Sequence, residues 1–272
     1  MLRLAFLGSG SSGNAALIRW GQTRLLLDCG FSVAELSRRL AGLGERLEDV
    51  QAVFVTHEHS DHVAALRGLS RRGHLALGLT AGTARAVKLA KRAKAERLEV
   101  RPGVPLRVGE IEVLTFRTLH DACEPVGYRF GFPDGSALGI ATDLGVAGDG
   151  AVEALRGCAL LGLESNHDPD MLRAGPYPAF LKRRILSDRG HLSNAQAADL
   201  LGRLAHPGLR QVFLLHLSKV NNRPPLAAAV LGEKLRSLGL GAGLAVVGPD
   251  QPLEYPARNR ADAPRPQLEL FA

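Results

Sequence analysis

The chain has 272 residues, of which 46 % are hydrophobic and 22 % charged, and this balance excludes a largely disordered protein. The formal net charge of +7 favours anionic partners such as nucleic acids, although a soluble protein rich in arginine has the same balance. Three cysteines, Cys29, Cys123 and Cys158, include no C-x-x-C pair, which excludes a disulfide framework and favours a reducing compartment.

Apolar runs are short throughout the chain. No stretch approaches the roughly 20 apolar residues that a membrane span needs, and the apolar run at the N-terminus is too short for a secretion signal. We therefore expect a cytoplasmic protein that does not contact a membrane.

Apolar runs and turn residues predict the elements of the first half. The expected strands are 2–7, 16–20, 23–28, 50–56, 104–108, 111–118, 126–132 and 136–142. Helical periodicity covers 32–43, and Thr80 is placed to cap a second helix that runs through Lys94. The loop at 8–14 (GSGSSGN) either approaches a phosphate through its backbone N–H groups or is simply a tight turn after the first strand.

Strands and helices alternate in the second half. The expected strands are 159–164, 210–216 and 243–248, the last of the chain. Ser193 and Gln196 form a capping-box pattern that opens a helix at 194–204, and Pro224-Pro225 starts another that ends near Gly239. Mixed strands with interspersed helices predict an α/β fold in which helices pack on sheets.

One segment is dense in metal-ligand side chains. His57-Glu-His59-Ser-Asp61-His62 follows directly on a buried strand. Imidazole suits zinc, manganese or iron, and a carboxylate adds negative charge. We expect a loop here, because neither a helix nor a strand could aim all four side chains at one point.

This H-x-H-x-D-H run resembles the signature of the metallo-β-lactamase superfamily. The resemblance covers roughly residues 1–250 and implies a four-layer αβ/βα sandwich with metals at one edge of the two sheets. It implies two divalent ions, zinc or manganese, and it marks Asp28 as the aspartate that supports the metal-binding loop. The implied ligands are His57, His59 and His120 on one ion, Asp61, His62 and His216 on the other, and Asp143 between them.

Four further segments resemble the YycJ (WalJ) subgroup of this superfamily, which is similar to tRNase Z. They begin at Glu164 (ESNHD), Tyr177 (YPAFLKRRI), Gly190 (GHLSN) and His216 (HLSKVNN). The resemblance implies a hydrolase that degrades double-stranded DNA as a 5′→3′ exonuclease.

In that subgroup a glutamate and a histidine assist the chemistry, and they correspond to Glu164 and His191. His191 could protonate the leaving oxygen while Glu164 orients it, and Asp61 could orient the nucleophile. The alternative for His191 is a structural histidine that precedes a helix.

Basic residues lie between these segments. Lys182, Arg183 and Arg184 could contact a phosphate backbone beside the metals, or they could form a solvated basic face.

Three functions are compatible with these sequence features. The leading one is an exonuclease on DNA in repair or replication. The alternatives are an RNA-processing endonuclease of the tRNase Z kind and a hydrolase of small phosphodiesters or thioesters.

The tail has a different composition. Residues 256–266 are rich in Pro, Arg, Ala and Asp, and they predict an extended linker after a hydrolase domain at 1–255. The linker ends in a peptide that resembles those by which bacterial replication and repair proteins dock on the DNA sliding clamp. Its matching residues are Gln267, Leu268, Leu270 and Phe271. The alternative is a terminal segment that packs on the protein's own surface.

Overall fold

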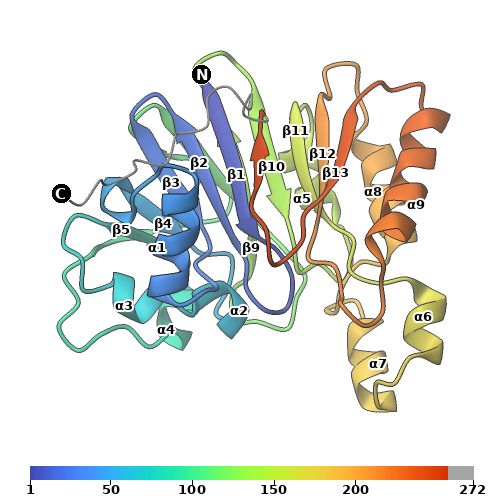
Figure 1. The fold of residues 1–272 in the computed structure, drawn as a ribbon, viewed down its shortest axis with the longest axis horizontal. Helices are drawn as coiled ribbons and strands as arrows, with labels where there is room; N and C mark the ends of the chain where they lie inside the picture. The colour runs from blue at the N-terminus through green and yellow to red at the C-terminus, as the bar shows by residue number, and fades with distance from the viewer. Residues whose placement is uncertain (257–272) are drawn as a thin grey trace, which may run out of the picture.

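The computed structural model describes residues 1–256, whose strands form two seven-stranded sheets (Figure 1). In spatial order, the first sheet consists of β14 (Leu253–Tyr255), β1 (Leu2–Gly8), β2 (Ala15–Trp20), β3 (Thr23–Leu27), β4 (Ala52–Phe54), β5 (Ala76–Leu79) and β6 (Glu96–Glu99). The second consists of β13 (Gly243–Val246), β12 (Gln211–Leu215), β11 (Leu160–Glu164), β10 (Ala137–Ala141), β9 (Val126–Gly131), β8 (Ile111–Arg117) and β7 (Leu106–Val108).

Helices cover the outer faces of both sheets. In chain order they are α1 (Val33–Gly42), the 3-10 turn η1 (Leu47–Asp49), α2 (Ser60–Val63), α3 (Leu66–Leu69), α4 (Ala81–Ala86), α5 (Asp149–Leu155), α6 (Pro169–Ala174), α7 (Ala179–Ile185), α8 (Asn194–Leu204) and α9 (Pro224–Ser237). In Figure 1, α1 lies over the first sheet, whereas α8 and α9 lie against the second.

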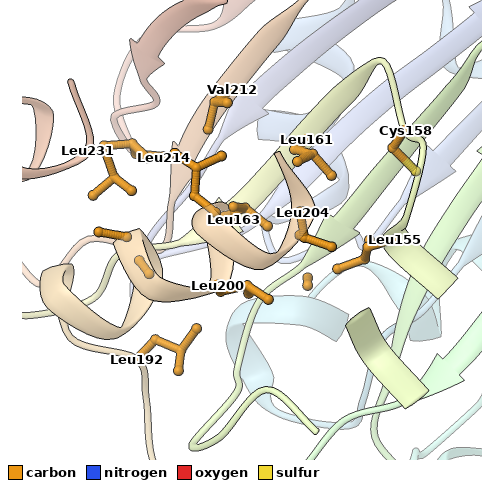
Figure 2. Close-up of a cluster of buried hydrophobic side chains, with 14 of the residues drawn as sticks. Leu155, Cys158, Leu161, Leu163, Leu192, Leu200, Leu204, Val212, Leu214 and Leu231 are labelled. Atoms are coloured by element: carbon orange, nitrogen blue, oxygen red, sulfur yellow. The ribbon is translucent and has the colours of Figure 1, made fainter. Parts of the chain in front are cut away.

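Three buried clusters hold these layers together. Between the sheets, Phe6 packs on Phe213 with ring centroids 4.9 Å apart, and Phe54 packs on Tyr128 at 5.7 Å. A second cluster joins the first sheet to α1, and a third joins the second sheet to α5, α8 and α9 (Figure 2). The order helix, sheet, sheet, helix confirms the predicted α/β four-layer sandwich.

Most expected strands are confirmed to within a few residues at each end. The helix at 194–204 is also confirmed, with the Ser193–Gln196 capping box that the sequence predicts. The expectation that strand 243–248 is the last was wrong, because β14 follows it and pairs antiparallel with β1.

The helix expected at 80–94 is much shorter. Thr80 does cap it, since its hydroxyl accepts a hydrogen bond from the Thr83 N–H at 3.2 Å. However, α4 ends at Ala86. The segment beyond it folds back on Ser70, which accepts hydrogen bonds from the backbone N–H groups of Ala90 and Lys94. These tertiary hydrogen bonds outweigh the helix propensity of the Lys- and Ala-rich sequence.

Parallel pairing sets the position of the candidate site. Strands β3 to β6 run parallel, and so do β10 to β13. The carboxyl ends of parallel strands meet at one edge of a sheet, where the loops that follow them can converge. The candidate residues Asp28, His57, Asp143, Glu164 and His216 all lie at or just beyond such strand ends.

Within residues 1–256, no helix combines the length and the apolar character that a membrane crossing requires. Cys29, Cys123 and Cys158 are free thiols, in agreement with the expected lack of a disulfide framework. Of the tail, all but Pro256 lies outside the described residues, and the clamp-like peptide at 267–271 lies there too.

Candidate metal centre

Three candidate residues have an unusual backbone conformation. Among residues 1–256, the non-glycine residues with positive φ are Asp28 (60°), Asp143 (58°) and His216 (55°). Each follows a parallel strand of the central sheets. Such conformations are costly for residues other than glycine and gather at functional sites. At each of these strand ends, therefore, the fold accepts a strained residue at the edge where the site lies.

The run from His57 to His62 is only partly the loop that we expected. His57 and His59 do lie in a loop, but Asp61 and His62 belong to α2, a single helical turn. The turn closes because the His62 N–H donates to the His59 carbonyl at 2.9 Å. The Cys29 N–H in turn donates to the His62 carbonyl at 2.8 Å, which ties the turn to the end of β3.

All seven predicted ligands converge in space. Their nitrogen and oxygen donor atoms form sets, and the atoms within each set lie within 4.8 Å of one another. The sets are His57, His59 and His120; Asp61, His62 and His216; His57, His62 and Asp143; and a fourth that joins Asp143 and His216 to Glu164 and His191. His57 and His62 each belong to a set with Asp143, so Asp143 lies between the first two sets.

Asp28 organises two of these histidines. One of its carboxylate oxygens lies 2.8 Å from Nδ1 of His62, and the other accepts the Thr56 N–H at 2.8 Å. The Thr56 hydroxyl reaches the same carboxylate and also lies 3.0 Å from Nδ1 of His57. These contacts fix the ring orientations and direct the Nε2 atoms of His57 and His62 away from Asp28. Carboxylate–histidine contacts of this kind are common behind metal ligands.

The donor set fits a divalent cation. Nε2 of His57 is buried and has no hydrogen-bond partner among the described residues. Burial, followed by the charge of His62, lowers the pKa of His57 well below its ordinary value, so the neutral form that metals bind is favoured. Nδ1 of His120 lies 3.1 Å from the Gly190 carbonyl and so carries the proton, which leaves Nε2 free as a ligand.

His191 and Glu164 form a second feature beside this cluster. Nδ1 of His191 lies 2.6 Å from one oxygen of Glu164, and the other oxygen accepts the Leu144 N–H at 2.8 Å. Burial acts to lower the pKa of His191, but the charge and hydrogen bond of Glu164, with Asp143 and Asp121, outweigh it and raise the pKa to about 9. These carboxylates thus favour the protonated form of His191 beside the ligand cluster. His191 lies beside the candidate ligands, and its predicted catalytic role stays a prediction.

A cavity of about 200 Å³ opens on these side chains. One wall consists of the ligands His59, Asp61, His120, Asp143 and His216, together with His191. The opposite wall comes from α7 and the residue two before it, with Tyr177, Leu181, Arg184 and Ile185. The metal cluster therefore faces a small, open space in which a substrate can reach it.

The three predicted basic residues lie on α7 but differ in their surroundings. Arg184 lines the cavity, and its Nε donates to Asp121 at 2.6 Å. Lys182 donates to the Arg173 carbonyl at 2.6 Å, and Arg183 is exposed outside the cavity lining. The structure thus brings one of the three, Arg184, to the candidate site.

Sequence reasoning missed several supporting residues. Ser9 accepts the His216 N–H at 2.8 Å, and Asn14 accepts from the Ser9 hydroxyl while its own N–H donates to the Asp61 carbonyl. The loop at 8–14 is thus a brace between two ligand segments, in addition to any phosphate contact. The sequence features that pointed to this supporting role were the length of the loop and its position at the end of β1. His167, a neighbouring histidine, is buried outside the cavity lining, and its carbonyl accepts a hydrogen bond from the N–H of Asn194 at the start of α8.

Comparisons with known proteins agree with this geometry. Residues 23–217 match the family model described as a β-lactamase superfamily domain. The exodeoxyribonuclease WalJ of Streptococcus pneumoniae is 34 % identical over 249 residues, which cover 89 % of this chain and 91 % of that protein. The exodeoxyribonuclease YycJ of Bacillus anthracis is also 34 % identical, over 89 % of this chain and 92 % of its own length.

More distant proteins share the fold. A ribonuclease Z of Methanopyrus kandleri is 33 % identical over 48 % of this chain and 51 % of its own length. Among solved structures, the metallo-β-lactamase fold protein YhfI of Bacillus subtilis has a TM-score of 0.69 at 18 % identity and covers 93 % of this chain and 99 % of its own. We conclude that the chain belongs to the β-lactamase superfamily, as a hydrolase of the metallo-β-lactamase fold with His/Asp clusters suited to divalent metal ions.

Proposed function

We propose that this protein is a metal-dependent exodeoxyribonuclease that acts 5′→3′ in DNA repair or replication. One observation carries the proposal: His191, which is hydrogen-bonded to the buried Glu164, lines the same open cavity as five of the candidate ligands. Two relatives that match nearly the whole chain are named exodeoxyribonucleases, and the net charge of +7 suits a polyanionic substrate.

We assign the seven candidate ligands to two ion positions. His57, His59 and His120 would hold one ion, and Asp61, His62 and His216 the other, with Asp143 between them. Zinc or manganese suits this mixture of imidazole and carboxylate. When bound, two such ions lower the pKa of water to give a nucleophile near neutral pH and neutralise charge on a phosphodiester.

The protein's own side chains would donate and accept protons and would position the substrate. The protonated His191, held at Nδ1 by Glu164, offers the proton on its other ring nitrogen to the leaving oxygen. Asp61, whose side chain is 21 % exposed, can accept a hydrogen bond from the attacking water. Arg184 at the cavity rim can bind the phosphate that follows the scissile bond, with Lys182 and Arg183 contributing positive charge further along the backbone.

We propose the division into a hydrolase domain at 1–255 and a docking tail at 256–272. In this proposal Gln267, Leu268, Leu270 and Phe271 bind the DNA sliding clamp and bring the nuclease to replicating or repaired DNA in the cytoplasm. A pull-down with purified clamp tests it, because a chain with Gln267→Ala, Leu270→Ala and Phe271→Ala should lose binding. Equal binding by that variant and the wild type would overturn the docking role.

RNA processing is the second candidate, favoured by the match to a ribonuclease Z over about half of the chain. A substrate panel separates the two: 5′-phosphorylated duplex DNA, single-stranded DNA, precursor tRNA and a small phosphodiester, each with Mn²⁺ or Zn²⁺. Progressive shortening of DNA from its 5′ end supports the proposal. A single internal cut in precursor tRNA, with DNA left intact, would favour the alternative.

A further inference from the structure

Helix α7 presents an unusual side chain to solvent. Phe180 is 67 % exposed and is the one aromatic residue among the exposed large hydrophobic side chains of residues 1–256. Figure 1 shows α6 and α7 projecting from the end of the second sheet, away from the layers that bury the core. A single exposed aromatic ring is common on protein surfaces, so a role for Phe180 depends on what lies near it.

The position of Phe180 on α7 places it at the rim of the metal cavity. Tyr177 and Arg184 both line the cavity, and they lie three residues before and four residues after Phe180. Phe180 and Arg184 both belong to α7, and residues four apart in a helix are neighbours on its surface. Phe180 itself lies outside the cavity lining, one helical turn before Arg184, which belongs to the lining.

Arg184 connects this rim to the ligands. Its Nε lies 2.6 Å from Asp121, and the other oxygen of Asp121 lies 3.4 Å from Nε2 of His120. Contacts thus run from the Arg184 guanidinium through Asp121 to the candidate ligand His120. A phosphate at Arg184 and a base against Phe180 would belong to one nucleotide beside the metal centre.

Charge and size define the occupant of this rim. The last turn of α7 carries Lys182, Arg183 and Arg184, so a negatively charged partner is favoured. The cavity of about 200 Å³ can take a phosphate and part of a sugar but not a base pair. We therefore expect the phosphate and part of the sugar of a terminal nucleotide to enter the cavity, while its base stays outside, near α7.

On these grounds, and resting on the proposed nuclease function, we infer that Phe180 is a stacking platform for the unpaired terminal base of a DNA strand. Arg184 holds the phosphate of the same nucleotide. The platform captures an end when it frays, and it thereby makes the protein prefer duplex ends that open easily. Aromatic stacking suits this role because every base has a flat face, so no sequence preference follows.

A binding cycle without cleavage tests the inference. With Mn²⁺ present and phosphorothioate linkages that resist cleavage, the affinity of the wild type for short 5′-phosphorylated single strands is measured with the 5′ base present and with an abasic 5′ nucleotide. We expect the abasic strand to bind about 5- to 100-fold more weakly, the range typical of one stacked base. Phe180→Ala should bind both strands equally, while Phe180→Trp should restore the difference. Leu186→Ala, which removes another exposed side chain from the end of α7, should leave the difference intact.

A kinetic measurement complements the cycle. Phe180→Ala should slow digestion of a blunt duplex more than digestion of the same duplex with a few unpaired nucleotides at its 5′ end.

Each contrary outcome has a separate meaning. If the wild type discriminates against the abasic strand and Phe180→Ala does so equally, the platform is elsewhere and the inference fails. The inference fails also if base removal at the 3′ end has the effect instead, or if the wild type binds both strands equally. If the wild type binds no DNA in either form, the proposed function fails with it, and a protein partner for Phe180 becomes the remaining reading.

Discussion

Nδ1 of His191 lies 2.6 Å from Oε1 of Glu164, a carboxylate that is completely buried at the end of β11. The second oxygen of Glu164 is held by the N–H groups of Leu144 and Leu192. Glu164 does not reach solvent, and its side chain contacts His191 at 2.6 Å and Nδ1 of His216 at 3.7 Å. In the proposed mechanism His191 is the proton donor and Glu164 positions it.

The two residues should therefore behave as one unit in kinetics. His191→Ala is expected to lower kcat on DNA by about 10²- to 10⁴-fold, the usual contribution of a general acid. Glu164→Gln should lower kcat by less, and the double variant should be no slower than His191→Ala alone. Metal content measured on each variant serves as the control, because it should stay at the wild-type value. Multiplicative losses in the double variant would show that Glu164 acts independently.

Asp28 should control metal affinity, because it orients His62 directly and His57 through Thr56. We expect Asp28→Asn to weaken metal binding by about 10- to 100-fold, as other changes behind metal ligands do. Competition with a chelating dye measures this affinity. Asp149→Asn is the matched control, since Asp149 is fully exposed and pairs with Arg203 at the surface. Unchanged affinity in Asp28→Asn would contradict the supporting role of this carboxylate.

Metal ions should also stabilise the fold. Because the ligands come from distant parts of the chain and meet only in the native state, an ion binds the folded form preferentially. At a free metal concentration 100 times the dissociation constant, the free energy of unfolding should rise by about 2.7 kcal/mol per site. Thermal unfolding with and without Mn²⁺ or Zn²⁺ measures the effect. His216→Ala should show a smaller rise than the wild type, and an equal rise would place the ion elsewhere.

Glu45 gives a prediction for stability against pH, far from the metal centre. Its side chain is 6 % exposed and bonds Arg19 at 2.6 Å and Arg24 at 2.7 Å. Burial acts to raise the pKa of Glu45, but the hydrogen bonds and charges of the two arginines outweigh it, and the pKa is lowered. A lowered pKa means that the stabilisation is complete above the unfolded value, near 4.5, and is lost as the pH falls through the lower folded value.

Urea unfolding of wild type and Glu45→Gln tests this relation. At pH 7 the variant should be less stable by about 1–3 kcal/mol, the usual cost of losing hydrogen bonds to a charged group. The difference should shrink towards pH 3. A difference that grows as the pH falls would reverse the assigned sign.

The candidate ligands that converge in the structure could be identified because most of them lie close in sequence or at recognisable strand ends. His57 to His62 form one short run, and Asp143 and His216 each follow an apolar strand. Their left-handed backbone at Asp143 and His216 was not predictable, because aspartate and histidine adopt that conformation only where tertiary contacts enforce it.

Other elements escaped prediction for physical reasons. Strand β6 is the edge strand Glu96–Glu99, with mostly exposed polar residues and no apolar alternation, so only its pairing with β5 makes it a strand. Helix α4 ends early because the Ser70 hydroxyl accepts a hydrogen bond from the N–H of Ala90, in the segment that follows the helix. Helix α7 has seven residues, fewer than periodicity can establish, although it supplies one wall of the cavity.

The most direct test of the account is a metal titration of DNA hydrolysis. Metal-free protein receives increasing Mn²⁺ while degradation of 5′-phosphorylated duplex DNA is followed, with Asp143→Ala in parallel. We predict no cleavage without metal, activity that saturates at two ions per chain in the wild type, and none in Asp143→Ala, which lacks the carboxylate between the two ligand sets. Cleavage that persists in a chelator, or that Asp143→Ala retains in full, would contradict the account.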